Sequence, residues 1–172
     1  VFGIGFRKAD KIAAKMGVAP DDEFRIKSGV KFTLSYFAGE GNTFLPRGML
    51  CEKTGQLLEL PTEVIDDELT SMAFEGEIHI ENLENRNVVF LEAYYMAEQN
   101  VCKCLASINS ARLKPISGSV ESLISRTEAA TGIYLSENQK HAVTTSLNMG
   151  VSVITGGPGT GKTTIINTII NI

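Results

Sequence analysis

The hydrophobic residues of this chain recur mainly at helical spacing, so most of its elements are predicted to be helices. The first predicted helix carries four apolar residues in the i, i+3, i+4, i+7 pattern: Ala9, Ile12, Ala13 and Met16. Gly17 suits the end of this helix, because glycine accepts the left-handed conformation that follows many helix C-termini.

Further helices follow, and in one segment apolar and polar residues alternate as they do in paired strands. The predicted helices cover residues 24–37, Pro46 to near Leu60, 93–110 and 119–131. One further helix is predicted to be capped by Thr62 and to end at Gly76. Apolar residues alternate on both sides of the polar turn 82–87, which predicts a β-hairpin formed around Ile78, Ile80, Val88 and Phe90. Three helices followed by a hairpin is the order of a winged-helix unit, which binds DNA or serves as a protein spacer.

The C-terminal part has the pattern of a strand, a glycine-rich loop and a helix. The apolar segment 151–155 predicts a short buried strand, and a helix is predicted by Ile165, Ile166, Ile169 and Ile170. Between them, the run from Gly156 to Thr164 fits G-x-x-x-x-G-K-[ST], the phosphate-binding P-loop. The alternative is a glycine-rich turn before an ordinary helix. The order of elements favours the P-loop, which predicts ATP with Mg²⁺ as ligand.

The residue types in the loop suit a triphosphate. Glycines without a Cβ let the backbone turn and direct N–H groups at phosphate oxygens. Lys162 is predicted to reach the β- and γ-phosphates, the hydroxyl of Thr163 to ligate Mg²⁺, and Thr164 to lie near the α-phosphate. Lys162 and Thr163 are therefore the predicted catalytic residues. The predicted nucleotide contacts are Gln139, Gly156, Gly157, Pro158, Gly159, Thr160, Gly161, Lys162, Thr163 and Thr164.

Gln139 has two interpretations that remain open together. Ser136 followed three residues later by Gln139 is a capping-box pattern, which explains both residues structurally. The side-chain amide of Gln139 also carries donors and an acceptor, which suits one edge of adenine.

The N-terminal segment predicts contacts with DNA. Gly3-Ile4-Gly5 before a helix resembles the hairpin of a helix-hairpin-helix motif, whose backbone N–H groups hold a phosphate without reading bases. The alternative is a tight turn that begins a core helix. The predicted DNA-binding residues are Gly3, Gly5, Arg7, Lys8 and Lys11.

Composition and charge narrow these predictions. The chain has 172 residues, 43% of them hydrophobic, and no apolar run approaches the roughly 20 residues that span a bilayer, so no membrane contact is expected. Its net charge is −4, and residues 62–98 hold ten acids against Arg86 alone, which favours the spacer interpretation of the winged-helix unit. Three cysteines without a second Cys/His pair indicate reduced thiols and a cytoplasmic protein.

The motifs together resemble a known family. Leu135-Ser-Glu-Asn-Gln139 and the loop 156–164 resemble the first two motifs of superfamily 1 DNA helicases. With residues 1–13 ahead of them, the chain looks like the bacterial RecD-like (exodeoxyribonuclease V alpha-subunit-like) helicases. The resemblance implies a 5′-to-3′ ATP-dependent motor on single-stranded DNA in repair or recombination. It also implies that Gln139 reads adenine and that Gly3 and Gly5 lie in the DNA-binding hairpin.

The expected fold is mainly α with a small β component. The predicted domains are a helix-hairpin-helix remnant at 1–20, a winged-helix-like helical unit at 22–113 and the start of a P-loop α/β domain at 119–172. Later helicase motifs do not follow the loop, so we expect a truncated piece that is inactive alone. Residues 150–172 are expected to pack against another copy, to dock on the helical part or to be poorly ordered. Expected partners are single-stranded DNA, single/double-strand junctions and repair-complex proteins. The alternatives are an AAA-type ATPase and a non-catalytic DNA-binding or partner-binding module.

Overall fold

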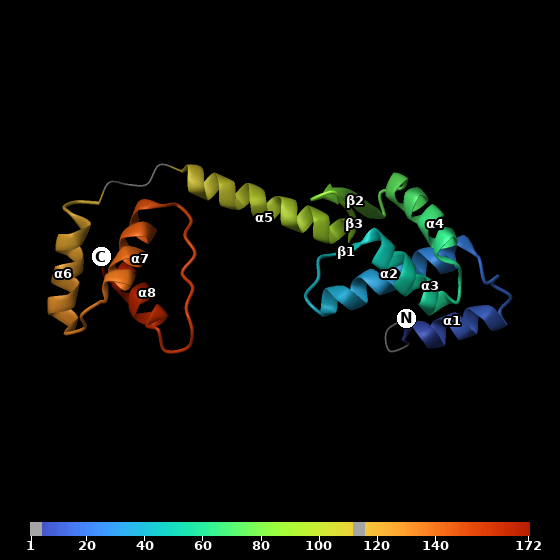
Figure 1. Cartoon of the computed structure of the whole chain (residues 1–172), viewed down its shortest axis with the longest axis horizontal. Coiled ribbons are helices and arrows are strands. Elements are labelled where there is room, and N and C mark those ends of the chain that lie inside the picture. Colours follow the sequence, from blue (N-terminus) through green and yellow to red (C-terminus); the bar gives the residue numbers. More distant parts are fainter. Residues whose placement is uncertain (1–4, 112–115) are drawn as a thin grey trace. The chain divides into compact units, whose positions relative to one another are not determined.

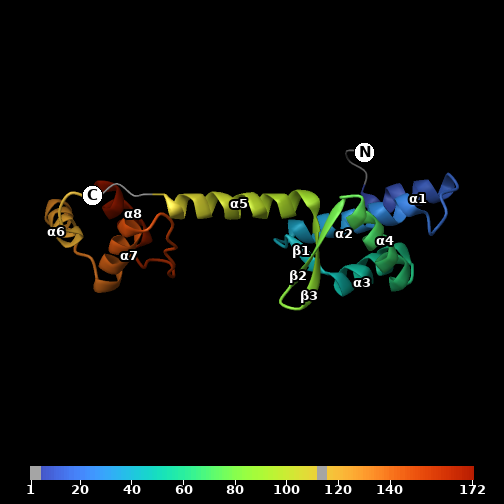
Figure 2. The ribbon, with the colours of Figure 1, turned by 90° about the horizontal axis from the view of Figure 1, so that it is seen from above.

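The computed structural model describes residues 5–111 and 116–172. It is mostly helical with one small three-stranded sheet, as predicted (Figure 1). Two compact units comprise Val1–Asn100 and Val101–Ile172, and the long helix α5 (Glu92–Ser110) runs through the division (Figure 2). None of the described helices combines the length and the apolar character needed to cross a bilayer.

The first two helices open the N-terminal unit. They are α1 (Phe6–Lys15) and α2 (Glu23–Gly39), both close to the predicted ranges. Asp22 begins α2, because its carboxylate accepts hydrogen bonds from two backbone N–H groups of the first turn.

The face by which α1 packs differs from the predicted one. Ile12 and Met16 are 49% and 80% exposed, so the predicted apolar stripe is not the buried face. Instead, the ring of Phe6 stacks on Phe32 of α2 with 4.8 Å between centroids. Asp10 accepts two hydrogen bonds from the Arg25 guanidinium, at 2.7 and 3.0 Å. A stacked ring and a bidentate ion pair therefore fix the rotation of α1.

Together with α2, the remaining elements of this unit have the order of a winged helix. They are β1 (Phe44–Pro46), α3 (Arg47–Leu58), α4 (Thr62–Phe74), β2 (Ile78–Leu83) and β3 (Arg86–Leu91). The sheet is antiparallel with strand order β1-β3-β2. The predicted hairpin is confirmed, and its turn residues Glu84 and Asn85 both have positive φ, which matches the twist of the two strands.

Two details of this unit differ from the sequence-based expectation. Strand β1 was not predicted, because three residues are too few to show alternation. The predicted Thr62 cap is wrong, since Pro61 occupies the cap position and Thr62 is the first helical residue. The core joins α2, α3, α4 and the sheet through Ile26, Val30, Leu34, Leu45, Leu50, Cys51, Leu58, Ile65, Leu69, Met72, Ile78 and Val89.

The described residues of the C-terminal unit form three helices besides the end of α5. They are α6 (Val120–Thr131), α7 (Glu137–Asn148) and α8 (Lys162–Asn171). Gly132 ends α6 with φ of 70°, as predicted. One buried cluster joins the helices: Ile124, Leu135, Val143 and Ile165. This cluster holds the first turn of α8 against α6 and α7.

The predicted strand at 151–155 is absent from the described structure. No strand is assigned there, and Val153 is 85% exposed, whereas Ile154 packs partly against the cluster around Val143. A strand requires a neighbour with which to exchange backbone hydrogen bonds. Among the described residues no segment pairs with 151–155, so the apolar pattern gives an irregular connection.

Candidate functional site

The loop before α8 has the backbone that its glycines predict. Gly159 and Gly161 have φ of 76° and 83°, a region that residues with a Cβ rarely adopt. Gly161 occupies the N-cap position of α8, and no side chain caps this helix. The first backbone N–H groups of α8 are therefore directed out of the helix end, where an anion is favoured.

Two glycines are also required by close packing. A Cβ on Gly161 would lie 2.4 Å from Nε2 of Gln139, and one on Gly156 would lie 2.6 Å from Oγ1 of Thr160. The hydroxyl of Thr160 in turn donates to the carbonyl of Gly157 at 2.9 Å. A side chain at either glycine would displace these contacts and change the curvature of the loop.

Lys162 lies across the loop. Its Nζ donates to the carbonyl oxygens of Gly156 and Gly157, at 2.7 Å each. The ammonium group is thus held over the concave backbone of the loop. Phosphate oxygens are charged and are stronger acceptors than carbonyls, so a triphosphate in the loop would compete well for this ammonium.

The two threonines after Lys162 differ in exposure. Thr163 is exposed at the first turn of α8, so its hydroxyl is free to reach a bound metal. Thr164 is half-buried, and its carbonyl accepts from the hydroxyl of Thr168 at 2.9 Å. Within 5–111 and 116–172 no three His, Cys, Asp or Glu side chains converge as metal ligands. The hydroxyl and the nucleotide's own phosphates are therefore the fitting ligands for Mg²⁺.

Gln139 joins the start of α7 to the loop. Its Oε1 accepts from the backbone N–H of Ser136 at 2.9 Å, and Ser136 Oγ accepts from the N–H of Gln139 at 3.4 Å, which completes the capping box. Its Nε2 donates to the carbonyl of Thr160 at 3.1 Å. A primary amide has two N–H donors and two acceptor lone pairs, so one of each remains for adenine.

A buried carboxylate that sequence reasoning did not find supports this arrangement. Glu128 on α6 is 8% exposed and accepts from the backbone N–H of Leu135 at 2.8 Å. Its carboxylate also lies 3.9 Å from the ammonium of Lys140. Glu128 thereby fixes the connection into α7 one residue before the capping box. A single glutamate in an amphipathic helix gives no sequence signal for such a role.

The predicted DNA-binding residues lie at the start of α1, except Gly3, which lies outside the described residues. Arg7, Lys8 and Lys11 are all exposed. The carbonyl of Gly5 accepts from the N–H groups of Lys8 and Ala9, at 2.9 and 3.2 Å. Gly5 has φ of −68°, and a Cβ there would meet no protein atom within 4 Å. Its lack of a side chain leaves the basic start of α1 open to a close-approaching group.

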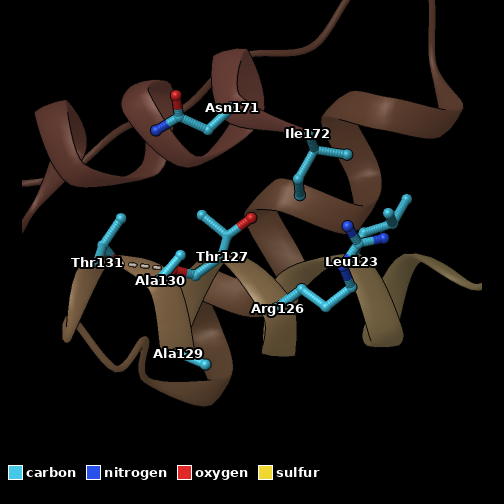
Figure 3. A pocket seen from close by; sticks show the side chains of 8 residues that line it. All are labelled: Leu123, Arg126, Thr127, Ala129, Ala130, Thr131, Asn171 and Ile172. Carbon is cyan, nitrogen blue, oxygen red and sulfur yellow. Dashed lines mark hydrogen bonds between the residues drawn. The ribbon is translucent and has the colours of Figure 1, made fainter.

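A hollow of about 850 Å³ lies between α6 and the last residues of α8. Figure 3 shows Thr127 and Thr131 on one wall, joined by a hydrogen bond from the Thr131 hydroxyl to the Thr127 carbonyl, with Asn171 and Ile172 opposite. The hollow is at the opposite end of α8 from Lys162, and none of the predicted site residues lines it. It is therefore separate from the phosphate-binding loop.

The glycine loop and the first turn of α8 have the features of a nucleotide-binding P-loop, and the family comparisons agree with this. Residues 139–172 match the family model described as AAA domain. Residues 1–44, which include α1 and α2, match the model described as ATP-dependent RecD2 DNA helicase HHH domain. The match of residues 1–44 supports the resemblance to RecD-like helicases at the N-terminal end, and the match of residues 139–172 agrees with a nucleotide-binding loop at the C-terminal end.

Curated relatives of this chain include RecD subunits of the RecBCD enzyme. The chain is similar to the RecBCD enzyme subunit RecD of Mycolicibacterium smegmatis, with 38% identity over 80 residues, 46% of this chain and 13% of that protein. The RecBCD enzyme subunit RecD of Mycobacterium tuberculosis is 35% identical over 85 residues, 49% of this chain and again 13% of the relative. The match thus spans a small part of each relative.

Proposed function

We propose that this chain is the N-terminal part of an ATP-dependent DNA helicase of the RecD-like type, which moves 5′-to-3′ on single-stranded DNA in repair or recombination. The observation that carries the proposal is the position of Lys162 over the glycine loop, which Gln139 joins to α7. The other end of the same chain matches a helicase domain. The match of residues 1–44 to a helicase domain favours a helicase over a generic AAA-type ATPase or a module without catalytic activity.

The nucleotide site is assigned as follows. Lys162 holds the β- and γ-phosphates, Thr163 ligates Mg²⁺, Thr164 lies near the α-phosphate, and Gln139 contacts adenine with its remaining donor and acceptor. The loop backbone from Gly156 to Gly161 surrounds the phosphates. The group that positions the attacking water and the transition-state arginine belong to other parts of the helicase, so this chain alone binds ATP without turning it over.

The DNA site is the start of α1. Gly3 and Gly5 bring the backbone close to a phosphate, and Arg7, Lys8 and Lys11 supply countercharge. The ligand is single-stranded DNA or a single/double-strand junction, in the cytoplasm of a bacterium. Relatives named as subunits of RecBCD support assembly with other repair proteins. The exposed Val153 and Ile170 support self-association of the isolated chain.

The proposal is tested by ATP hydrolysis in the whole protein, with and without single-stranded DNA. Lys162→Ala is expected to lower DNA-stimulated turnover by at least about tenfold, because a charge-assisted contact to phosphate is lost. Lys103→Ala, an exposed lysine on α5, is the matched control and should leave turnover unchanged. Near-normal turnover of Lys162→Ala would contradict the helicase assignment.

A further inference from the structure

A groove in the N-terminal unit combines exposed aromatic rings with cations, and of its lining residues only Arg7 has been assigned a role above. It lies between α1, α2 and α3 and has a volume of about 410 Å³. Phe32 and Tyr36 line it from α2, Arg7 from α1, and Lys53 and Gln56 from α3. The same unit has a folded core of its own, so the groove is a formed surface.

The aromatic residues are arranged as a continuous row. Phe6 stacks on Phe32, the rings of Phe32 and Tyr36 lie 6.5 Å apart, and Tyr36 meets Phe37 edge-on at 5.5 Å. Tyr36 is 56% exposed at the open end of this row. A half-exposed ring whose orientation is fixed by Phe37 presents apolar, polarisable area at low entropic cost. Such a ring is suited to stacking with another flat ring.

The charges of the groove favour an anionic ligand. Among the described residues that line it, Arg7 and Lys53 are cations and none is an acid, although the whole chain has a net charge of −4. Glu52 lies outside the lining, with an oxygen 4.0 Å from the Lys53 ammonium. By contrast, the groove near Cys51 on the other side of α3 is lined by three acids, Glu63, Asp66 and Asp67. Cations beside an exposed ring are the pattern with which proteins hold single strands.

We propose that this groove binds single-stranded DNA, with a base stacked on Tyr36 and neighbouring phosphates at Arg7 and Lys53. The inference rests on the proposed function, because the ligand is the helicase's own DNA. The groove shares Arg7 with the site at the start of α1 but adds a ring for a base, whereas the α1 site contacts phosphates alone. The groove requires unpaired bases, so it would distinguish single strands from duplex within one unit.

The test compares two probes on the 172-residue chain by fluorescence anisotropy: an oligothymidine of about 12 nucleotides and an abasic strand of the same length. Both probes carry the same phosphates, so a difference between their affinities reports the contribution of base stacking. The wild-type chain is expected to bind the oligothymidine at least about fivefold more tightly. Tyr36→Ala should remove this preference, and Tyr36→Phe should retain it because the ring remains. Tyr134→Ala, an exposed tyrosine outside the groove, is the matched control.

Other outcomes separate this proposal from the proposed function. Lys8 and Lys11 changed together to Glu should weaken both probes equally, through phosphate contacts at α1. A base preference that persists in Tyr36→Ala overturns the groove assignment and leaves the α1 site intact. If the wild-type chain binds neither probe, both the groove assignment and the α1 site are overturned. A stronger affinity for an RNA strand of the same length, or equal competition by an acidic peptide of the same charge, also overturns the assignment to DNA.

Discussion

The side-chain Nε2 of Gln139 donates a hydrogen bond to the backbone carbonyl of Thr160 at 3.1 Å, so the start of α7 is joined directly to the P-loop. The same amide accepts from the N–H of Ser136. One residue therefore stabilises a helix start and orients a loop 21 residues away in sequence. A change at this position has two consequences, which suitable substitutions can separate.

Gln139→Glu keeps the capping box but removes the donor to Thr160. A carboxylate still accepts from the Ser136 N–H, so the melting temperature should stay near that of the wild type. Nucleotide binding should weaken, because the carboxylate repels the Thr160 carbonyl and the phosphates. Gln139→Ala loses both contacts and should also lower the melting temperature by about 4 °C or more. Differential scanning fluorimetry and titration with a fluorescent ATP analogue measure the two effects; equal loss of stability in both variants would contradict the separation.

The loop could be predicted from sequence because its chemistry is local. Glycines at fixed spacing, Lys162 and Thr163 are adjacent in the chain, and Gly159 and Gly161 do adopt the left-handed backbone that only glycine tolerates well. The contact from Gln139 to Thr160 could not be predicted, because it depends on how α7 and α8 pack around Val143 and Ile165. Glu128 was missed for the same reason.

The fold was predicted where the pattern is long and was wrong where it depends on a neighbour. The helices and the hairpin follow from repeats of several turns or several alternations. Residues 151–155 have an apolar pattern but no described strand beside them, and β1 forms from three residues because β3 is there to pair with it. The packing face of α1 is set by Phe6 and the Asp10–Arg25 ion pair, which outweigh the exposed Ile12.

Charge reversal at the start of α1 should weaken DNA binding by the whole protein without regard to sequence. Lys8 and Lys11 are exposed, and each phosphate contact releases about one counterion from duplex DNA. Changing both to Glu should therefore make the fall of log K with log salt shallower, by about two units of slope. Anisotropy at several salt concentrations, with single/double-strand junctions of different sequence, gives this slope. Lys103→Glu with Arg126→Glu, two exposed cations of α5 and α6, is a control of equal charge; an unchanged slope in the α1 variant would exclude this surface.

The Arg47–Asp66 ion pair should make the N-terminal unit sensitive to acid. Arg47 donates to the Asp66 carboxylate, which lowers the pKa of Asp66 below its ordinary 3.8, and it also donates to the Asp66 carbonyl at 2.9 Å. A group with a lowered folded-state pKa stabilises the fold above its unfolded pKa, and this contribution is lost as pH falls through the folded value. Asp66→Asn should thus be less stable than wild type at pH 6 but lose less stability between pH 5 and pH 3.

Thermal melts across this range measure the effect. The difference in melting temperature between wild type and Asp66→Asn should be constant above about pH 5 and should shrink below pH 4. Asp21→Asn, which removes an exposed acid from outside the described ion pairs, should leave the shape of the pH curve unchanged. A difference that does not vary with pH would mean that Asp66 acts only as a neutral hydrogen-bond acceptor.

The three cysteines should react with an alkylating reagent at very different rates. Cys51 is buried between α3 and α4, and its burial, together with a hydrogen bond to Asp66, raises the pKa of its thiol to about 11. Cys102 and Cys104 are exposed on α5. Because the thiolate is the nucleophile, ionisation alone should slow Cys51 about a hundredfold at pH 8, and burial slows it further.

Mass spectrometry after iodoacetamide at pH 8 should therefore find Cys102 and Cys104 modified while Cys51 remains intact. Guanidinium, which unfolds the core, should make all three react. In the variant with Cys102→Ser and Cys104→Ser, Cys51 is the one remaining thiol, so its reaction with a chromogenic disulfide reports directly on opening of the α3–α4 contact. Rapid modification of native Cys51 would show that this contact opens readily, and the thiol would then not serve as a marker of the folded core.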